Sequence, residues 1–181
     1  MTKYGIISDT HVDRSYDQEK LILLLGQLRE IFKDVEQIFH AGDIIEKSFL
    51  EELNKIAPVR AVNGETEKID GLEDFILLKI QNYKIGIIHK LPEDNKKLES
   101  FCRKNELIGG ILIFGHTHQP LIKGTPFNTL LLNPGSPTHP KAPDEVKGFN
   151  KPKAKPSVIL LTIENEIVTS IIVNLTTIKI K

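Results

Sequence analysis

Short apolar runs alternate with helix-like segments through the first third of the chain. Residues 3–9 (KYGIISD), 36–43 (EQIFHAGD) and 58–64 (PVRAVNG) are typical of buried strands. Between them, residues 16–33 and 46–56 place apolar side chains at helical spacing. This strand–helix–strand–helix–strand order predicts a parallel sheet with right-handed crossovers.

The rest of the chain is richer in strands. Residues 74–80 and 83–89 flank Gln81-Asn82, which is typical of a hairpin, and a third helix is expected over 92–107. Further strands are expected at 110–115, 120–124, 128–136, 157–165 and 167–175, the last two forming a closing hairpin. The pattern predicts an α/β fold of mixed α+β character, with one domain over residues 1–181 and no internal repeat.

Composition narrows the class of protein. A hydrophobic fraction of 40% and a charged fraction of 27% are ordinary for a soluble protein, and the net charge is zero. Neutrality argues against general nucleic-acid binding, and only the Lys-rich residues 147–155 favour it.

No apolar stretch approaches the ~20 residues of a membrane span. The first residues lead at once into a strand, and the one cysteine, Cys102, is typical of a buried thiol in a reducing compartment. A cytoplasmic location is therefore expected, and a homo-oligomer is compatible with the sequence.

Acidic and histidine side chains follow the predicted strands, where each strand ends. His116 and His118, in FGHTHQP, project to the same side of an extended segment, so they either converge on one site or are unrelated loop residues. The full set at strand ends is Asp9, His11, Asp43, Glu65, His89, His116 and His118. The carboxyl ends of strands are the edge where open α/β sheets build their sites, which favours convergence.

These donors are oxygen and imidazole groups without a thiolate. That chemistry suits manganese, iron, nickel, zinc or magnesium better than a structural zinc site. Seven donors are too many for one ion, whereas two ions that share a bridging carboxylate fit, and such pairs hydrolyse phosphate esters. A water or hydroxide between the ions attacks in line. His116 and His118 would then bind different ions, and manganese is the ion we expect.

The order D-x-H (9–11), G-D (42–43) and G-H-x-H (115–118) resembles the calcineurin-like metallophosphoesterases. The closer resemblance is to the small archaeal and bacterial phosphodiesterases of the YfcE-like branch, to which the retromer subunit VPS29 is similar. The segment NPGSPTHPK (133–141) looks like the N-P-G-S signature of that branch. The resemblance covers essentially the whole chain. It implies a sandwich of two mixed β-sheets flanked by helices, and hydrolysis of a small phosphodiester by a metal-bound hydroxide.

The resemblance also implies a role for each position. The first metal would be held by Asp9, His11 and His118, the second by His89 and His116, with Asp43 bridging the two. These six residues form the expected catalytic set.

The sequence departs from the family at the remaining ligand of the second metal. The family has an asparagine where this chain has Glu65, and Asn63 lies on the other side of Gly64. Three interpretations remain open. Glu65 binds the metal directly, which we favour; Asn63 supplies an amide instead; or the second site is weakened and the protein is a VPS29-like binding scaffold with reduced or lost catalysis. With Glu65 as a ligand the centre carries three carboxylates, which should tighten metal binding and weaken attraction for an anionic phosphate.

Other positions border the expected site. Lys90 stands where many relatives have glycine and could reach a substrate phosphate, and His139 could contact substrate. Thr66 replaces the general-acid histidine of superfamily phosphomonoesterases, which favours diesters with good leaving groups. Residues 137–156, rich in Pro and Lys, read as a mobile surface loop or, less simply, as a basic flap over an anionic substrate.

Supporting roles are expected for four further residues. His40 reads as a packed side chain that helps to orient a ligand. Asn133 and Ser136 should brace the loop that carries His116 and His118, with Gly135 supplying the turn between them.

Overall fold

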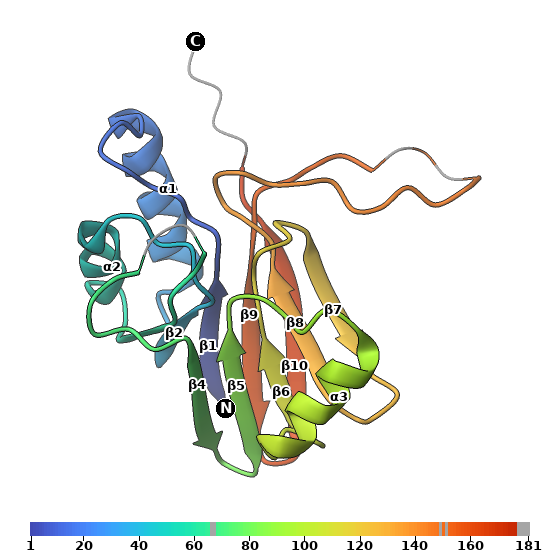
Figure 1. The fold of residues 1–181 in the computed structure, drawn as a ribbon. Helices are drawn as coiled ribbons and strands as arrows, with labels where there is room; N and C mark the ends of the chain where they lie inside the picture. Colours follow the sequence, from blue (N-terminus) through green and yellow to red (C-terminus); the bar gives the residue numbers. More distant parts are fainter. Residues whose placement is uncertain (66–67, 149, 151, 177–181) are drawn as a thin grey trace.

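The computed structural model describes residues 1–65, 68–148, 150 and 152–176. Within these residues it has two five-stranded sheets and three helices (Figure 1). Thr66 lies outside the described residues, so its expected effect on leaving groups stays a sequence prediction. Among the described residues, none of the helices has the length and apolar character needed to cross a membrane.

The first sheet has the order β10-β9-β1-β2-β3. Its strands are β1 (Thr2–Ile7), β2 (Gln37–His40), β3 (Val59–Ala61), β9 (Ser157–Glu164) and β10 (Ile167–Asn174). β1, β2 and β3 are parallel neighbours, which confirms the parallel sheet expected from the first third of the chain. β9 joins β1 antiparallel and pairs with β10 as the predicted hairpin.

The second sheet has the order β4-β5-β6-β8-β7. Its strands are β4 (Phe75–Ile80), β5 (Tyr83–Ile88), β6 (Ile111–Ile113), β7 (Pro120–Gly124) and β8 (Leu130–Pro134). β4 and β5 form the predicted hairpin, whereas β5, β6 and β8 run parallel. Both sheets are therefore mixed, and the expected sandwich of two mixed sheets is confirmed.

Apolar side chains from the two sheets meet in one central cluster, which includes Ile6, Phe39, Ile87 and Ile113. Helices α1 (Gln18–Ile31) and α2 (Lys47–Asn54) contribute Leu28 and Leu53 to a second cluster against the first sheet, and α3 (Asn95–Lys104) contributes the buried Cys102 to a third. Burial of these faces removes apolar surface from water, the dominant stabilising contribution to folding.

Two of the three helices in the described residues, α1 and α3, begin later than their apolar periodicity suggests because a side chain caps each N-terminus. The carboxylate of Asp17 accepts a hydrogen bond from the backbone N–H of Lys20, so α1 begins at Gln18 rather than at residue 16. Asp94 caps α3 in the same way through Lys97. Strand β3 ends at Ala61, earlier than expected, and Val62 next to it forms an isolated bridge with Glu73.

Candidate metal centre

Polar residues that follow five strands converge at one edge of the sandwich. Asp9 and His11 follow β1, Asp43 follows β2, Glu65 follows β3, His89 follows β5, and His116 and His118 follow β6. In Figure 1 the arrowheads of β1 and β5 point to the same end of the molecule. The strand-end side chains of both sheets therefore meet, as expected for an α/β site.

The backbone at these positions takes an uncommon conformation. Nine described residues other than glycine have positive φ, and five of them belong to this set: Asp9 (52°), His11 (43°), Asp43 (56°), His116 (67°) and His118 (60°). Local contacts hold this geometry, because the N–H of Asp9 donates to Gly42 O at 3.0 Å and that of His116 to Asp9 Oδ1 at 3.0 Å. Such strain concentrates at functional sites.

One group of donors gathers around Asp9. The group contains Asp9, His11, Asp43 and His118, each offering a ligand atom within 4.8 Å of the others. Nε2 of His118 lies 3.2 Å from Nε2 of His11 and 3.4 Å from Oδ1 of Asp9. Burial raises the pKa of Asp9, so a nearby positive charge is needed to favour its carboxylate. A divalent ion would supply that charge.

A second group lies beside the first and contains Glu65, His89 and His116. Nδ1 of His116 is 3.1 Å from Oε2 of Glu65. Oδ2 of Asp43 lies 3.4 Å from Nε2 of His89 and 3.5 Å from Nε2 of His11. One carboxylate oxygen therefore contacts a histidine from each group.

Hydrogen bonds orient two of the histidines. Nδ1 of His89 lies 2.8 Å from the carbonyl of Ala41, and Nδ1 of His118 lies 2.7 Å from the carbonyl of His139. A carbonyl only accepts, so each Nδ1 carries a hydrogen, and in the neutral imidazole Nε2 is then the nitrogen that can bind a metal. Nε2 of His89 is buried without a hydrogen-bond partner. Oriented imidazoles, a buried imidazole nitrogen beside a carboxylate and clustered carboxylates fit divalent ions.

The structure distinguishes between Glu65 and Asn63, the two residues expected as alternatives for the remaining ligand of the second metal. The amide of Asn63 is used within its own loop: Oδ1 accepts from Ile69 N at 3.0 Å, and Nδ2 donates to Leu72 O at 2.8 Å. Glu65 instead lies at the centre, with its backbone N–H donating to Asp43 Oδ1 at 2.9 Å. This geometry supports Glu65 over Asn63.

Two glycines let backbone segments approach the carboxylates. A Cβ at Gly64 would collide with Oδ1 of Asp43, and one at Gly115 would collide with Ser8 Oγ and Asp9 Oδ2. These glycines belong to the motifs at 63–65 and 115–118. Their absent side chains, rather than their flexibility, explain the close approach.

The NPGS segment braces the centre. Nδ2 of Asn133 donates to Gly115 O at 2.9 Å, Oδ1 of Asn133 accepts from Gly135 N at 2.8 Å, and Ser136 Oγ donates to Asp9 O at 2.7 Å. Sequence analysis missed Thr138, whose hydroxyl donates to Thr10 O at 2.6 Å. The signal was present in the spacing of two hydroxyls, Ser136 and Thr138, directly after the turn.

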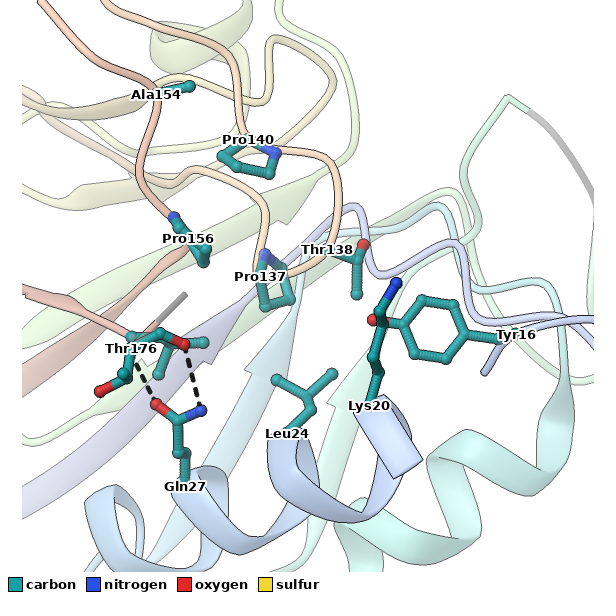
Figure 2. Close-up of a pocket in the computed structure, with 11 residues that line it drawn as sticks. Tyr16, Lys20, Leu24, Gln27, Pro137, Thr138, Pro140, Ala154, Pro156 and Thr176 are labelled. Atoms are coloured by element: carbon teal, nitrogen blue, oxygen red, sulfur yellow. Dashed lines mark hydrogen bonds between the residues drawn. The ribbon is translucent and has the colours of Figure 1, made fainter. Parts of the chain in front are cut away.

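Residues 137–140 lie between the metal centre and a neighbouring pocket. The ring of His139 packs edge-on against that of His11, with centroids 5.3 Å apart. On the other side of these residues, a pocket of about 240 Å³ lies against α1. Pro137, Thr138 and Tyr16 are among the residues that line it (Figure 2). The described part of 143–156 has no helix or strand and extends away from the sheets (Figure 1).

His40 lies in neither donor group and contacts the centre through Thr10, whose Oγ1 is 3.2 Å from Nε2 of His40. Complete burial lowers the pKa of His40 from 6.5 to about 3. The unfolded chain takes up a proton below pH 6.5 and the folded chain does not, so His40 costs stability as pH falls from 6.5 toward 3. The cost is at most about 1.4 kcal/mol per pH unit.

We therefore expect His40→Gln to flatten the rise in unfolding free energy between pH 4 and pH 6.5. The measurement is urea unfolding of metal-free protein at several pH values. The slopes are compared, so a general loss of stability in the variant does not affect the result. Equal slopes in the two proteins would show that His40 is protonated in the folded state.

A sandwich of two mixed sheets with oxygen and imidazole donors at its strand ends is the arrangement of a metal-dependent phosphoesterase. The chain belongs to the calcineurin-like phosphoesterase superfamily, whose domain model matches residues 2–166. It is 36% identical over 167 residues to a probable metallophosphoesterase of Methanothermobacter thermautotrophicus, covering 90% of this chain and 86% of the relative. A probable metallophosphoesterase of Methanocaldococcus jannaschii is 37% identical over 142 residues, covering 77% and 70%.

Solved structures show the same fold. Wild-type Vps29 of Entamoeba histolytica, complexed with Zn²⁺, superposes with a TM-score of 0.71 at 26% identity, covering 96% of this chain and 99% of that one. A predicted phosphoesterase of Streptococcus pneumoniae has a TM-score of 0.68 at 20% identity, covering 96% and 89%. The family implies divalent metal ions, and the two donor groups are the candidate ligands.

Proposed function

We propose that the protein is a binuclear-metal phosphodiesterase that hydrolyses a small phosphodiester. The observation that carries the proposal is the position of Asp43, whose Oδ2 contacts His11 of one donor group and His89 of the other. A carboxylate between two groups of ligands is what a bridged pair of ions requires.

In this proposal the first ion is held by Asp9, His11 and His118, the second by Glu65, His89 and His116, and both by Asp43. Bound there, divalent ions would neutralise phosphate oxygens and activate a water for in-line attack. The chain contributes fixed orientation: His118 and His89 are held by carbonyl acceptors, and Ser136 holds the backbone of Asp9.

Two side chains at the edge of the centre are proposed to bind substrate. The ammonium of Lys90 is half exposed. Thr138 uses its one hydrogen for Thr10 O at 2.6 Å, so Nδ1 of His139, at 2.9 Å, donates to Thr138 and leaves Nε2 for substrate. Preference for a diester is supported by Thr66, which cannot protonate a poor leaving group.

Manganese is the ion we propose, with zinc, nickel, iron and magnesium as alternatives that the donor types allow. The Zn²⁺ complex of the Entamoeba histolytica Vps29 supports zinc as the first alternative.

The test is hydrolysis of bis(p-nitrophenyl) phosphate by chelator-stripped protein while Mn²⁺ is added back. Activity that saturates near two equivalents is expected. Saturation near one equivalent would contradict the binuclear centre, and inactivity with Mn²⁺, Ni²⁺, Zn²⁺, Fe²⁺ and Mg²⁺ would contradict the phosphodiesterase.

A second candidate function is a protein-binding scaffold without catalysis. The similarity to Vps29 at 26% identity favours it, together with the departure at Glu65. Metal analysis of the purified protein separates the two candidates, because a scaffold has no need of two equivalents of metal.

A further inference from the structure

Lys90 and Glu65 form an ion pair at the edge of the second donor group. Lys90 directly follows His89, and its Nζ lies 2.7 Å from Oε1 of Glu65. The other oxygen of the same carboxylate, Oε2, lies 3.1 Å from Nδ1 of His116. Glu65 therefore has one oxygen on an ammonium group and one on the second donor group.

This pair differs from the rest of the centre in its exposure. The side chains of Lys90 and Glu65 are 52% and 51% exposed, whereas that of Asp43 is 7% exposed. A solvated pair contributes little to stability, so fold stability does not account for it. Its charge still acts on the centre, because Lys90 is bonded to a ligand carboxylate well within the ~10 Å Debye length.

The charges at the centre show what the ammonium changes. Asp9, Asp43 and Glu65 carry three negative charges. Two divalent ions bring four positive charges, so the net charge of ions and carboxylates is +1, and Lys90 raises it to +2. An uncharged amide ligand at position 65, without Lys90, would also give a net charge of +2. Lys90 thus makes a carboxylate ligand electrically equivalent to an amide.

We propose that Lys90 is a specificity-determining residue: a built-in counter-ion to Glu65 that weakens metal binding at the second position and restores the attraction of the centre for a phosphate anion. The inference rests on the proposed function. An ammonium has three N–H donors, so Lys90 can bind a phosphate oxygen while it stays on Glu65. Its effect therefore appears in the affinity for metal and in the affinity for phosphate, with opposite signs.

The experiment is a double-mutant cycle on Lys90→Met and Glu65→Gln, read by calorimetric titration of metal-free protein with Mn²⁺ and of loaded protein with inorganic phosphate. We expect Lys90→Met to tighten the second Mn²⁺ equivalent about five-fold and to weaken phosphate by a similar factor. Glu65→Gln should weaken the binding of the second Mn²⁺ equivalent and tighten the binding of phosphate. The double variant should bind phosphate as the parent protein does.

The matched control is Lys97→Met on α3, because Lys97 pairs with Glu93 at 2.6 Å and both are exposed. It should change neither affinity. If Lys90→Met leaves Mn²⁺ and phosphate affinities unchanged, or if the double variant does not return to the phosphate affinity of the parent protein, the counter-ion role is wrong while the binuclear enzyme stands. If the parent protein takes up no second equivalent of metal, the proposed function fails first.

Discussion

Asp43→Asn is expected to reduce bound Mn²⁺ from the proposed two equivalents to one or fewer, and the proposed phosphodiesterase activity by at least about 100-fold. Oδ2 of Asp43 lies between His11 and His89, so loss of its charge affects both donor groups. Changes to residues that only support metal ligands cost about 10- to 100-fold, and a shared ligand should cost more. The measurements are metal content after gel filtration and the rate with bis(p-nitrophenyl) phosphate.

Asparagine is the informative replacement at this position. Its Oδ1 can still accept the hydrogen bond that Glu65 N donates at 2.9 Å, and asparagine tolerates the φ of 56°. The backbone should therefore stay in place. Asp34→Asn, at an exposed carboxylate 3.8 Å from Lys3, is the control and should retain both equivalents. Full metal content in Asp43→Asn would remove Asp43 as the bridge.

His116→Ala and His118→Ala are each expected to lower the Mn²⁺ content to about one equivalent, but at different positions. His116 lies with Glu65, and His118 lies with Asp9. Activity should fall by at least about 100-fold in both variants, because the proposed mechanism needs both ions.

Combination with Glu65→Ala distinguishes the two positions. Adding Glu65→Ala to His116→Ala should change metal content little, since both substitutions remove ligands of the same metal position. Adding it to His118→Ala should remove the remaining equivalent. Residues that act on one site are not additive, and residues on separate sites are. The same metal content in both double variants would mean that the two histidines bind one ion.

Much of the fold was predictable because it depends on local patterns. Buried runs, helical spacing and the turn at Gln81-Asn82 predicted the order of elements and the parallel strands β1, β2 and β3 of the first sheet. Element ends were less accurate. Asp17 and Asp94 begin their helices two or three residues later than apolar spacing suggests, because capping depends on a single hydrogen bond.

The sequence was enough to predict which residues gather at the candidate site. Each donor follows an apolar strand, and parallel strands bring their carboxyl ends to a common edge. The assignment of donors to two groups agrees with the geometry, although the binding of metal by these residues stays a prediction. Thr138 was missed although its spacing from Ser136 was visible, because that spacing does not show that the hydroxyl bonds to the carbonyl of Thr10.

The sequence by itself determined which residues could come together at the candidate site, because it shows both the order of the predicted strands and the type of donor that follows each one. Only the tertiary structure decided how they meet. His11 and His118 are 107 positions apart, yet their Nε2 atoms lie 3.2 Å from each other. Asn63 turns into its own loop while Glu65 joins the centre and pairs with Lys90. Such choices depend on packing between two sheets and on single hydrogen bonds, which no local pattern encodes.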